Sequence, residues 1–149
     1  MERKMIRWLV WLLIGLSTQI SSAESAPGKA SLCDLQRGAK EGERRSVQVV
    51  GIYSNGLEMG VLTDPACSSQ HTWVELDLRS TTNKEMLRSI LDSKGHANVV
   101  FEGEFFGPER PDPNLPEAIR KSDHPGWGHL GAFKTKLVVH IIRSVNAGK

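Results

Sequence analysis

Three side chains that can bind a transition metal lie close together in one loop of the sequence. Asp123, His124 and His129 fall within SDHPGWGHLGAF, residues 122–133. Zinc sites usually take three or four His, Cys or carboxylate ligands at regular spacings. Here the two histidines lie five residues apart among three glycines, so no helix or strand face holds them together. We therefore favour a turn whose glycines adopt unusual backbone angles, and we predict no resident metal or cofactor.

Two glutamates are the second candidates for chemistry. Glu102 and Glu104 alternate along a predicted strand, so they share a face about 7 Å apart. Paired carboxylates can divide acid and base roles, as in glycosidases. A solvated strand face has the same pattern, and the sequence contains no nucleophile elbow, His-Glu-x-x-His or phosphate-binding loop. A metal- or carboxylate-dependent enzyme of the cell envelope is therefore an alternative to a binding function.

The N-terminus has the three parts of an export signal. A basic segment precedes an unbroken apolar run at residues 8–16, and small residues ending at Ala23 follow. The run is roughly half as long as a bilayer-spanning helix, which favours a cleaved signal over a membrane anchor. We predict a signal peptide at residues 1–23, with cleavage after Ala26 as the alternative.

Loss of this leader changes the charge of the chain. The formal net charge is +2, and residues 1–23 contribute all of it, so residues 24–149 are neutral. A neutral domain lacks the positive field that draws proteins to phosphate backbones. We expect one domain over residues 24–149, ordered over about 31–146, in the periplasm or secreted. It has no membrane span after cleavage, and nucleic acid is a disfavoured partner.

The chain has two cysteines, Cys33 and Cys67. An even count in an exported chain predicts a disulfide. Closing this loop of roughly 35 residues would stabilise the fold by roughly 3–4 kcal/mol. Redox-active pairs are normally closer in sequence, so we predict a structural bond.

Periodicity predicts five strands and two helices. A short helix begins after Ser31, whose side chain caps it. The main helix ends at Gly95, and Thr82 and Glu85 have the spacing of a capping box at its start. Asn55-Gly56 predicts a hairpin between the first two strands. The strands are expected at residues 46–54, 57–63, 72–78, 98–107 and 133–145.

Alternation along these strands predicts which side chains are buried together. The third to fifth strands place on one face Val74, Leu76 and Leu78, then Val99, Phe101 and Phe105, then Leu137, Val139 and Ile141. In the main helix, the predicted apolar stripe is Met86, Leu87, Ile90 and Leu91.

Five strands with a helix between the third and fourth give the chain order of an OB-fold. We predict an all-β protein with one or two helices, built as a five-stranded OB-like Greek-key barrel. The segments LCDLQ, SVQVVGIYSNG, FEGEFFGP and GWGHLGAF, spread over residues 32–145, resemble small exported bacterial OB-like domains without an assigned activity. This resemblance implies the fold and supplies no catalytic residues.

The predicted fold indicates where a ligand would bind. In OB-folds the loop between the fourth and fifth strands commonly lines the ligand site. Here that loop, residues 107–132, contains His124, Trp127 and His129, and Trp73 projects outward from the third strand. We predict a site at these four residues for an unknown protein or small molecule, with Trp127 covering the open end of the barrel.

A single-stranded nucleic-acid binder is the remaining alternative. Such proteins stack bases on aromatic side chains within a basic groove. Trp73 could stack a base, but its predicted neighbours on the same outer face are acidic: Glu75, Asp77, Glu102 and Glu104. These carboxylates oppose a phosphate chain.

Overall fold

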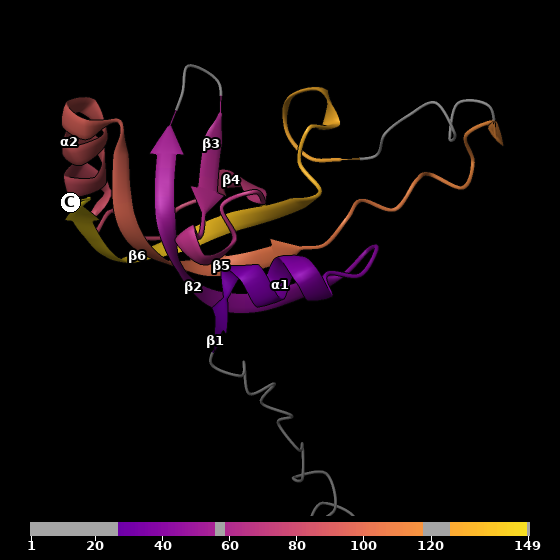
Figure 1. The fold of residues 1–149 in the computed structure, drawn as a ribbon, viewed down its shortest axis with the longest axis horizontal. Helices are drawn as coiled ribbons and strands as arrows, with labels where there is room; N and C mark the ends of the chain where they lie inside the picture. The colour runs from indigo at the N-terminus through magenta and orange to yellow at the C-terminus, as the bar shows by residue number, and fades with distance from the viewer. Residues whose placement is uncertain (1–26, 56–58, 118–125, 149) are drawn as a thin grey trace, which may run out of the picture.

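The computed structural model describes residues 27–55, 59–117 and 126–148 (Figure 1). The predicted signal peptide, Gly56 of the hairpin turn, and the loop residues Asp123 and His124 lie outside these ranges. The elements are β1 (Gly28–Ser31), α1 (Leu32–Gly38), β2 (Arg44–Asn55), β3 (Gly60–Thr63), the 3-10 turn η1 (Pro65–Cys67), β4 (His71–Leu76), α2 (Lys84–Lys94), β5 (His96–Phe106), the 3-10 turn η2 (His129–Gly131) and β6 (Thr135–Ala147).

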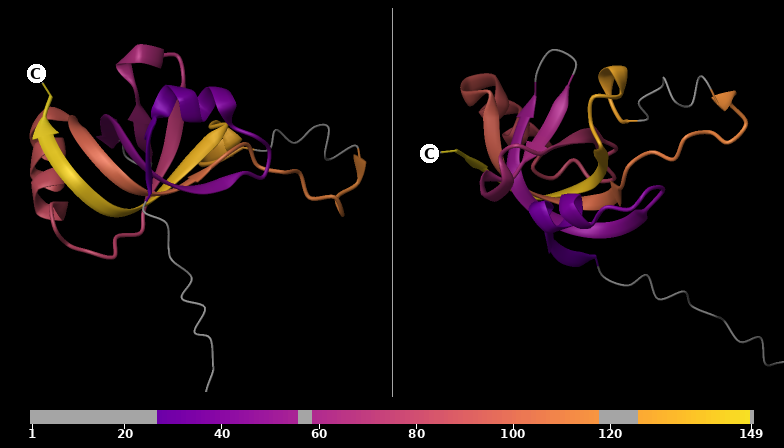
Figure 2. Two further views of the ribbon diagram at one scale, coloured as in Figure 1. Left: turned by 90° about the horizontal axis from the view of Figure 1, so that it is seen from below. Right: turned by 45° about the vertical axis from the view of Figure 1, so that its right-hand side comes forward.

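Strands β2 to β6 close into a five-stranded barrel. The order around it is β2, β3, β4, β6, β5, and the pairing of β5 with β2 completes the circle. All neighbouring pairs are antiparallel except β4 and β6, which are parallel. Helix α2 lies in the chain between the third and fourth barrel strands, and Figure 2 shows the curved strands around a common centre. The predicted all-β barrel with few helices is confirmed.

The two helices pack on different strands. Helix α2 leads directly into the start of β5 and packs on β5 and β6, with Leu87 buried. Helix α1 packs on β1 and β2. It precedes Arg44, which pairs with Phe106 at the far end of β5. Leu32 and Leu35 of α1 are fully buried in the same apolar core as Leu87. Figure 1 shows the helices on separate sides of the barrel.

Strand β5 has the inward face that its alternation predicts. Val99, Phe101 and Phe105 are all buried, and Gly103 takes the one inward position between the two phenylalanines. A Cβ at Gly103 would overlap the backbone carbonyl oxygen of Val138 on β6. Glycine is therefore needed here so that β5 and β6 can approach closely.

Strand β1 is not among the predicted strands, and most of it precedes the predicted ordered core of about 31–146. Residues Gly28–Ser31 pair in parallel with Val47–Val50 of β2. The segment has no apolar alternation, so its sequence carries no strand signal. Its order comes from backbone pairing with the edge of β2 and from Ala30, which packs against the core.

Helix α2 begins differently from the prediction. Its N-cap is Asn83, in the left-handed region at φ 64°, and no side-chain cap bond forms, so the predicted capping box of Thr82 and Glu85 is wrong. The Asn83 amide instead donates to the carbonyl oxygens of Ile142 (2.8 Å) and Arg143 (3.3 Å), which ties the helix start to β6. The end is as predicted, with Gly95 at φ 72°.

Three predicted core positions differ in the structure. Leu76 and Met86 are 44% and 52% exposed, since β4 ends at Leu76 and the stripe on α2 is narrower than expected. In β6 the inward side chain is Ile142 rather than Ile141, because the β5–β6 register shifts near this point. A bulge moves the following side chains to the other face, and alternation alone does not reveal it.

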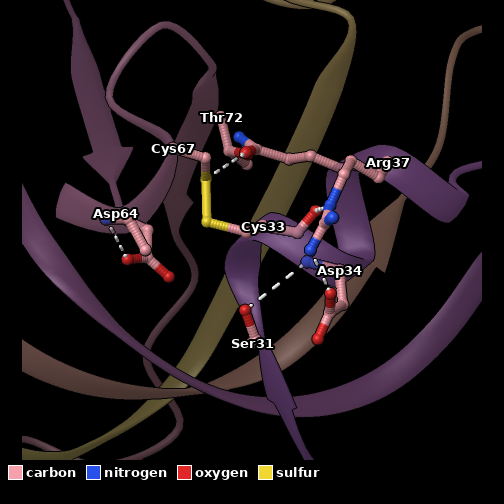
Figure 3. Close-up of a disulfide and its surroundings, with 9 residues drawn as sticks. Ser31, Cys33, Asp34, Arg37, Asp64, Cys67 and Thr72 are labelled. Atoms are coloured by element: carbon pink, nitrogen blue, oxygen red, sulfur yellow. Dashed lines mark hydrogen bonds and ion pairs between the residues drawn. A yellow bond between two sulfur atoms is a disulfide. The ribbon is translucent and has the colours of Figure 1, made fainter.

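The predicted disulfide between Cys33 and Cys67 is present, with the two Cα atoms 5.7 Å apart. It joins α1 to η1, the connection between β3 and β4 (Figure 3). Ser31 caps α1 as expected, its hydroxyl accepting from the Asp34 amide at 3.4 Å. The bond stabilises the fold by roughly 3–4 kcal/mol in the chain-entropy account.

The close approach at Gly103 gives a stability prediction. Gly103→Ala should lower the free energy of unfolding by about 3 kcal/mol, because the added methyl meets rigid backbone. Gly38→Ala is the control: its Cβ would have no neighbour within 4 Å, and the change should stay within about 0.5 kcal/mol. Denaturant unfolding measures both. Equal effects would show that β6 has room to move.

Tyr53 gives a prediction for alkaline pH. Its side chain is buried against Phe101, with the rings edge to face, and burial raises the pKa of its phenol above the ordinary 10.0. The folded state then holds this proton more tightly than the unfolded state, so stability is full below pH 10 and falls above it. Tyr53→Phe should reduce this fall in denaturant unfolding between pH 9 and 11. An unchanged slope would contradict the assignment.

Candidate functional site

A row of alternating aromatic and basic side chains crosses the outer face of the barrel. Trp73 pairs with Lys136, Lys136 with Phe106, and Phe106 with Arg44, on β4, β6, β5 and β2. The Lys136 ammonium lies 5.0 Å from the centre of the Phe106 ring, and the Arg44 guanidinium lies 5.4 Å from it. These are cation–π distances, so the row is held by contacts within the face itself.

Trp127 packs onto this row from the loop that precedes β6. Its ring lies 5.7 Å from that of Phe106, and the Lys136 ammonium lies 4.1 Å from its ring centre. Its indole N–H donates to the Gly107 carbonyl oxygen at 2.9 Å. Trp127 therefore fixes the loop to the outer face of β5 and β6. The contacts of its ring are with Phe106 and Lys136 of this face.

The loop itself is a tight turn closed by Trp127 and Phe133. The Trp127 amide donates to the Phe133 carbonyl oxygen at 2.7 Å, and the Phe133 amide donates back at 3.1 Å. Gly128 has φ 74° and lies against the Trp73 ring, where a Cβ would overlap it. The Phe133 and Trp73 rings are 5.5 Å apart. The loop thus contacts the outer face through two ring pairs, Trp127 with Phe106 and Phe133 with Trp73.

The tip of this loop exposes a leucine. Leu130 is 87% exposed and adopts φ 57°, a region that leucine rarely enters. No feature of the sequence indicates this conformation. The anchors on either side, Trp127 and Phe133, hold the tip in place while Leu130 faces solvent.

The acidic residues of the outer face have basic partners. Glu104 pairs with Arg44 and Glu102 with Arg143, each at 2.6 Å, and Glu75 lies 3.5 Å from Lys136. Asp77 lies 3.6 Å from His140. The three glutamates of the expected acidic face are therefore balanced by arginine or lysine. The pair formed by Glu102 and Glu104 is held by two arginines, as in an ordinary charged sheet surface.

Of the three candidate metal ligands, the structure describes only one. His129 begins η2, whereas Asp123 and His124 lie outside the described ranges. Among the described residues, one group of three metal-ligating side chains has its donor atoms within 4.8 Å of each other: Cys33, Asp64 and Cys67. The disulfide joins both sulfurs, so they are not the thiolates that bind metals.

A cleft of about 530 Å³ opens beside Phe133, where α1 and the starts of β4 and β6 meet. Residues 132–135 form one wall, α1 forms the second, and the residues leading into β4 form the third. The lining residues are Gln36, Arg37, Ser69, Gln70, His71, Ala132, Phe133, Lys134 and Thr135. No spacing or motif in the sequence indicates this cleft, because its walls come from three distant segments.

Polar contacts beneath the cleft connect its walls. The Gln36 amide donates to the Thr72 hydroxyl at 2.8 Å, and the hydroxyls of Thr72 and Thr135 are 2.8 Å apart. Both threonines are buried, and they are partners in the parallel β4–β6 pair. The Gln36 carbonyl oxygen lies 3.5 Å from the Cys67 sulfur (Figure 3). The disulfide therefore holds α1 where it forms a wall.

No protein-family model, curated protein or solved structure matches this chain. In the described part of the chain, no helix combines the length and apolar character needed to cross a bilayer.

The packing of Trp127 predicts how the loop can be released. Trp127→Ala should increase hydrogen exchange at the amides of residues 127 and 133 about tenfold or more, because the indole anchor on Gly107 and Lys136 is lost. Amides of β5 should keep their protection. Met86→Ala, at an exposed position on α2, is the control and should change neither. Unchanged exchange at residues 127 and 133 would show that the two backbone hydrogen bonds between them hold the loop without the indole.

Proposed function

We propose that this protein is an exported OB-fold module that binds a ligand in the cleft beside Phe133. When the barrel strands β2 to β6 are numbered one to five along the chain, their order around the barrel is 1-2-3-5-4. The barrel closes between the first and the fourth, β2 and β5, and this order supports the OB-fold assignment. The disulfide supports export, because such bonds persist in oxidising compartments. The periplasm or the extracellular medium is the corresponding location.

The position of the cleft is the observation that carries the binding function. One wall, residues 132–135, is the end of the connection between the fourth and fifth barrel strands. Ligands of OB-folds commonly bind beside this connection. The volume of about 530 Å³ lies within the usual range for small-molecule sites. Of the predicted site residues, Trp73 supports this wall through its contact with Phe133.

No specific observation favours the two alternatives. The aromatic row that might stack nucleic-acid bases is covered in part by Trp127, and its cations are engaged with Glu75 and Glu104. The paired glutamates that might act as acid and base are bound to arginines. Binding without chemistry is the simplest function for the cleft.

Thermal shift measurements with a library of cell-envelope metabolites test binding at the cleft. A ligand that stabilises the wild type should lose its effect in Ser69→Trp, because the indole fills the cleft from its exposed rim. Ser93→Trp, at an exposed position on α2, is the control and should respond like the wild type. A ligand that stabilises all three proteins equally binds elsewhere, and a library without any stabilising compound would count against a small-molecule site.

Intact mass of the protein from its native source tests export. The expected mass lacks residues 1–23 and is two hydrogens below that of the dithiol form. Retention of the leader or two free thiols would contradict export.

A further inference from the structure

We propose that the cleft accepts a small organic anion, with its charged group among the basic side chains and its apolar part against Phe133. This inference rests on the proposed function and names the class of ligand.

The ionisable side chains that line the cleft are all basic. Arg37, His71 and Lys134 each come from a different wall, and no aspartate or glutamate is among the lining residues. The other polar lining groups are amides and hydroxyls, which can donate hydrogen bonds. Arg37, His71 and Lys134 can all donate hydrogen bonds, and no carboxylate lines the cleft, so the lining favours an anion over a cation or a neutral ligand.

The cleft differs in this respect from the outer face of the barrel. There Arg44, Lys136 and Arg143 are all neutralised by glutamates. Within the described residues, neither Lys134 nor His71 forms an ion pair. The positive charge of Lys134 thus has no partner among the described residues that an anionic ligand would need to displace.

Arg37 is partly engaged but keeps donors for a ligand. Its Nη2 lies 2.6 Å from Asp34 and its Nε donates to the Cys33 carbonyl oxygen at 3.4 Å, as Figure 3 shows beside the disulfide. A guanidinium has five N–H donors, and these contacts use two of them. The side chain is 69% exposed, so the others are accessible. Arg37 can therefore bind a planar or tetrahedral anion without leaving Asp34.

The size and apolar wall of the cleft indicate an organic rather than an inorganic anion. A volume of about 530 Å³ far exceeds what one phosphate or sulfate fills. Phe133 and Ala132 line the cleft, and Phe133 is fixed by the Trp73 ring and by the Trp127 backbone. A rigid aromatic wall next to a basic rim matches a ligand with a ring or short chain attached to its charged group.

Titration of the oxidised, leader-free protein with four probes, followed by two-dimensional amide NMR at constant ionic strength, tests this ligand class. Benzoate and phenyl phosphate should shift the amides of residues 36–37, 69–71 and 132–135, and should bind at least about fivefold more tightly than benzamide. Inorganic phosphate should bind more weakly than phenyl phosphate. Benzamide binding as tightly as benzoate would contradict the inference that the ligand is an anion. Equal binding of inorganic phosphate and phenyl phosphate would contradict the inference that the anion carries an apolar organic group.

Charge variants give an independent test with opposite signs. Lys134→Gln and Arg37→Gln should each weaken benzoate binding about threefold or more. Asp34→Asn should strengthen it about threefold, because it removes the negative charge beside Arg37. Lys94→Gln, at the exposed end of α2, is the control and should change nothing.

Weaker or unchanged binding of benzoate in Asp34→Asn would contradict the role of Arg37. This inference can fail while the proposed function stands. If only neutral library compounds stabilise the wild type and lose their effect in Ser69→Trp, the cleft is a binding site but not one for anions.

Discussion

The long antiparallel pairing of β2 with β5 is the constraint on which the rest of the structure depends. It runs over eleven residue pairs, from Arg44–Phe106 to Ser54–His96, and it converts a sheet into a closed barrel. Closure directs Val47, Val49, Phe101 and Phe105 into one core and leaves Arg44, Glu102 and Glu104 on the outside. The aromatic and basic row, and the loop that Trp127 fixes to it, exist because this outer face is continuous across β4, β6, β5 and β2.

The two tryptophans that the sequence singles out support the same wall of the cleft through different contacts. Trp127 anchors the loop before β6 on Phe106 and Lys136, and Trp73 supports Phe133. Neither is an open stacking platform. They place residues 132–135 beside α1 and the start of β4, and the cleft forms in the space that remains. The side chains that attract attention in the sequence thus position the site, and less conspicuous ones line it.

Elements with strong local signals could be predicted from the sequence, and those set by distant contacts could not. Val99, Phe101 and Phe105 alternate cleanly, Gly95 ends its helix, and two cysteines behind a predicted export signal form a bond, so these features were predictable. Strand β1 has no apolar pattern and owes its order to the edge of β2. The cap at Asn83 depends on carbonyl groups of β6 about 60 residues away. The cleft lining is polar and comes from three segments, so no spacing in the chain indicates it.

Contacts run from the disulfide through Gln36 to Thr72 and Thr135 beneath the cleft, so the cleft wall formed by α1 depends on disulfide formation. Before Cys33 and Cys67 are oxidised, α1 has no covalent tether to the connection between β3 and β4, and the wall that bears Arg37 is secured by non-covalent packing alone. Oxidation therefore gives this wall of the cleft a covalent tether at the step that also locks the fold. Under the proposed function, binding at the cleft would follow disulfide formation, and a chain whose cysteines are still reduced would lack the fixed wall.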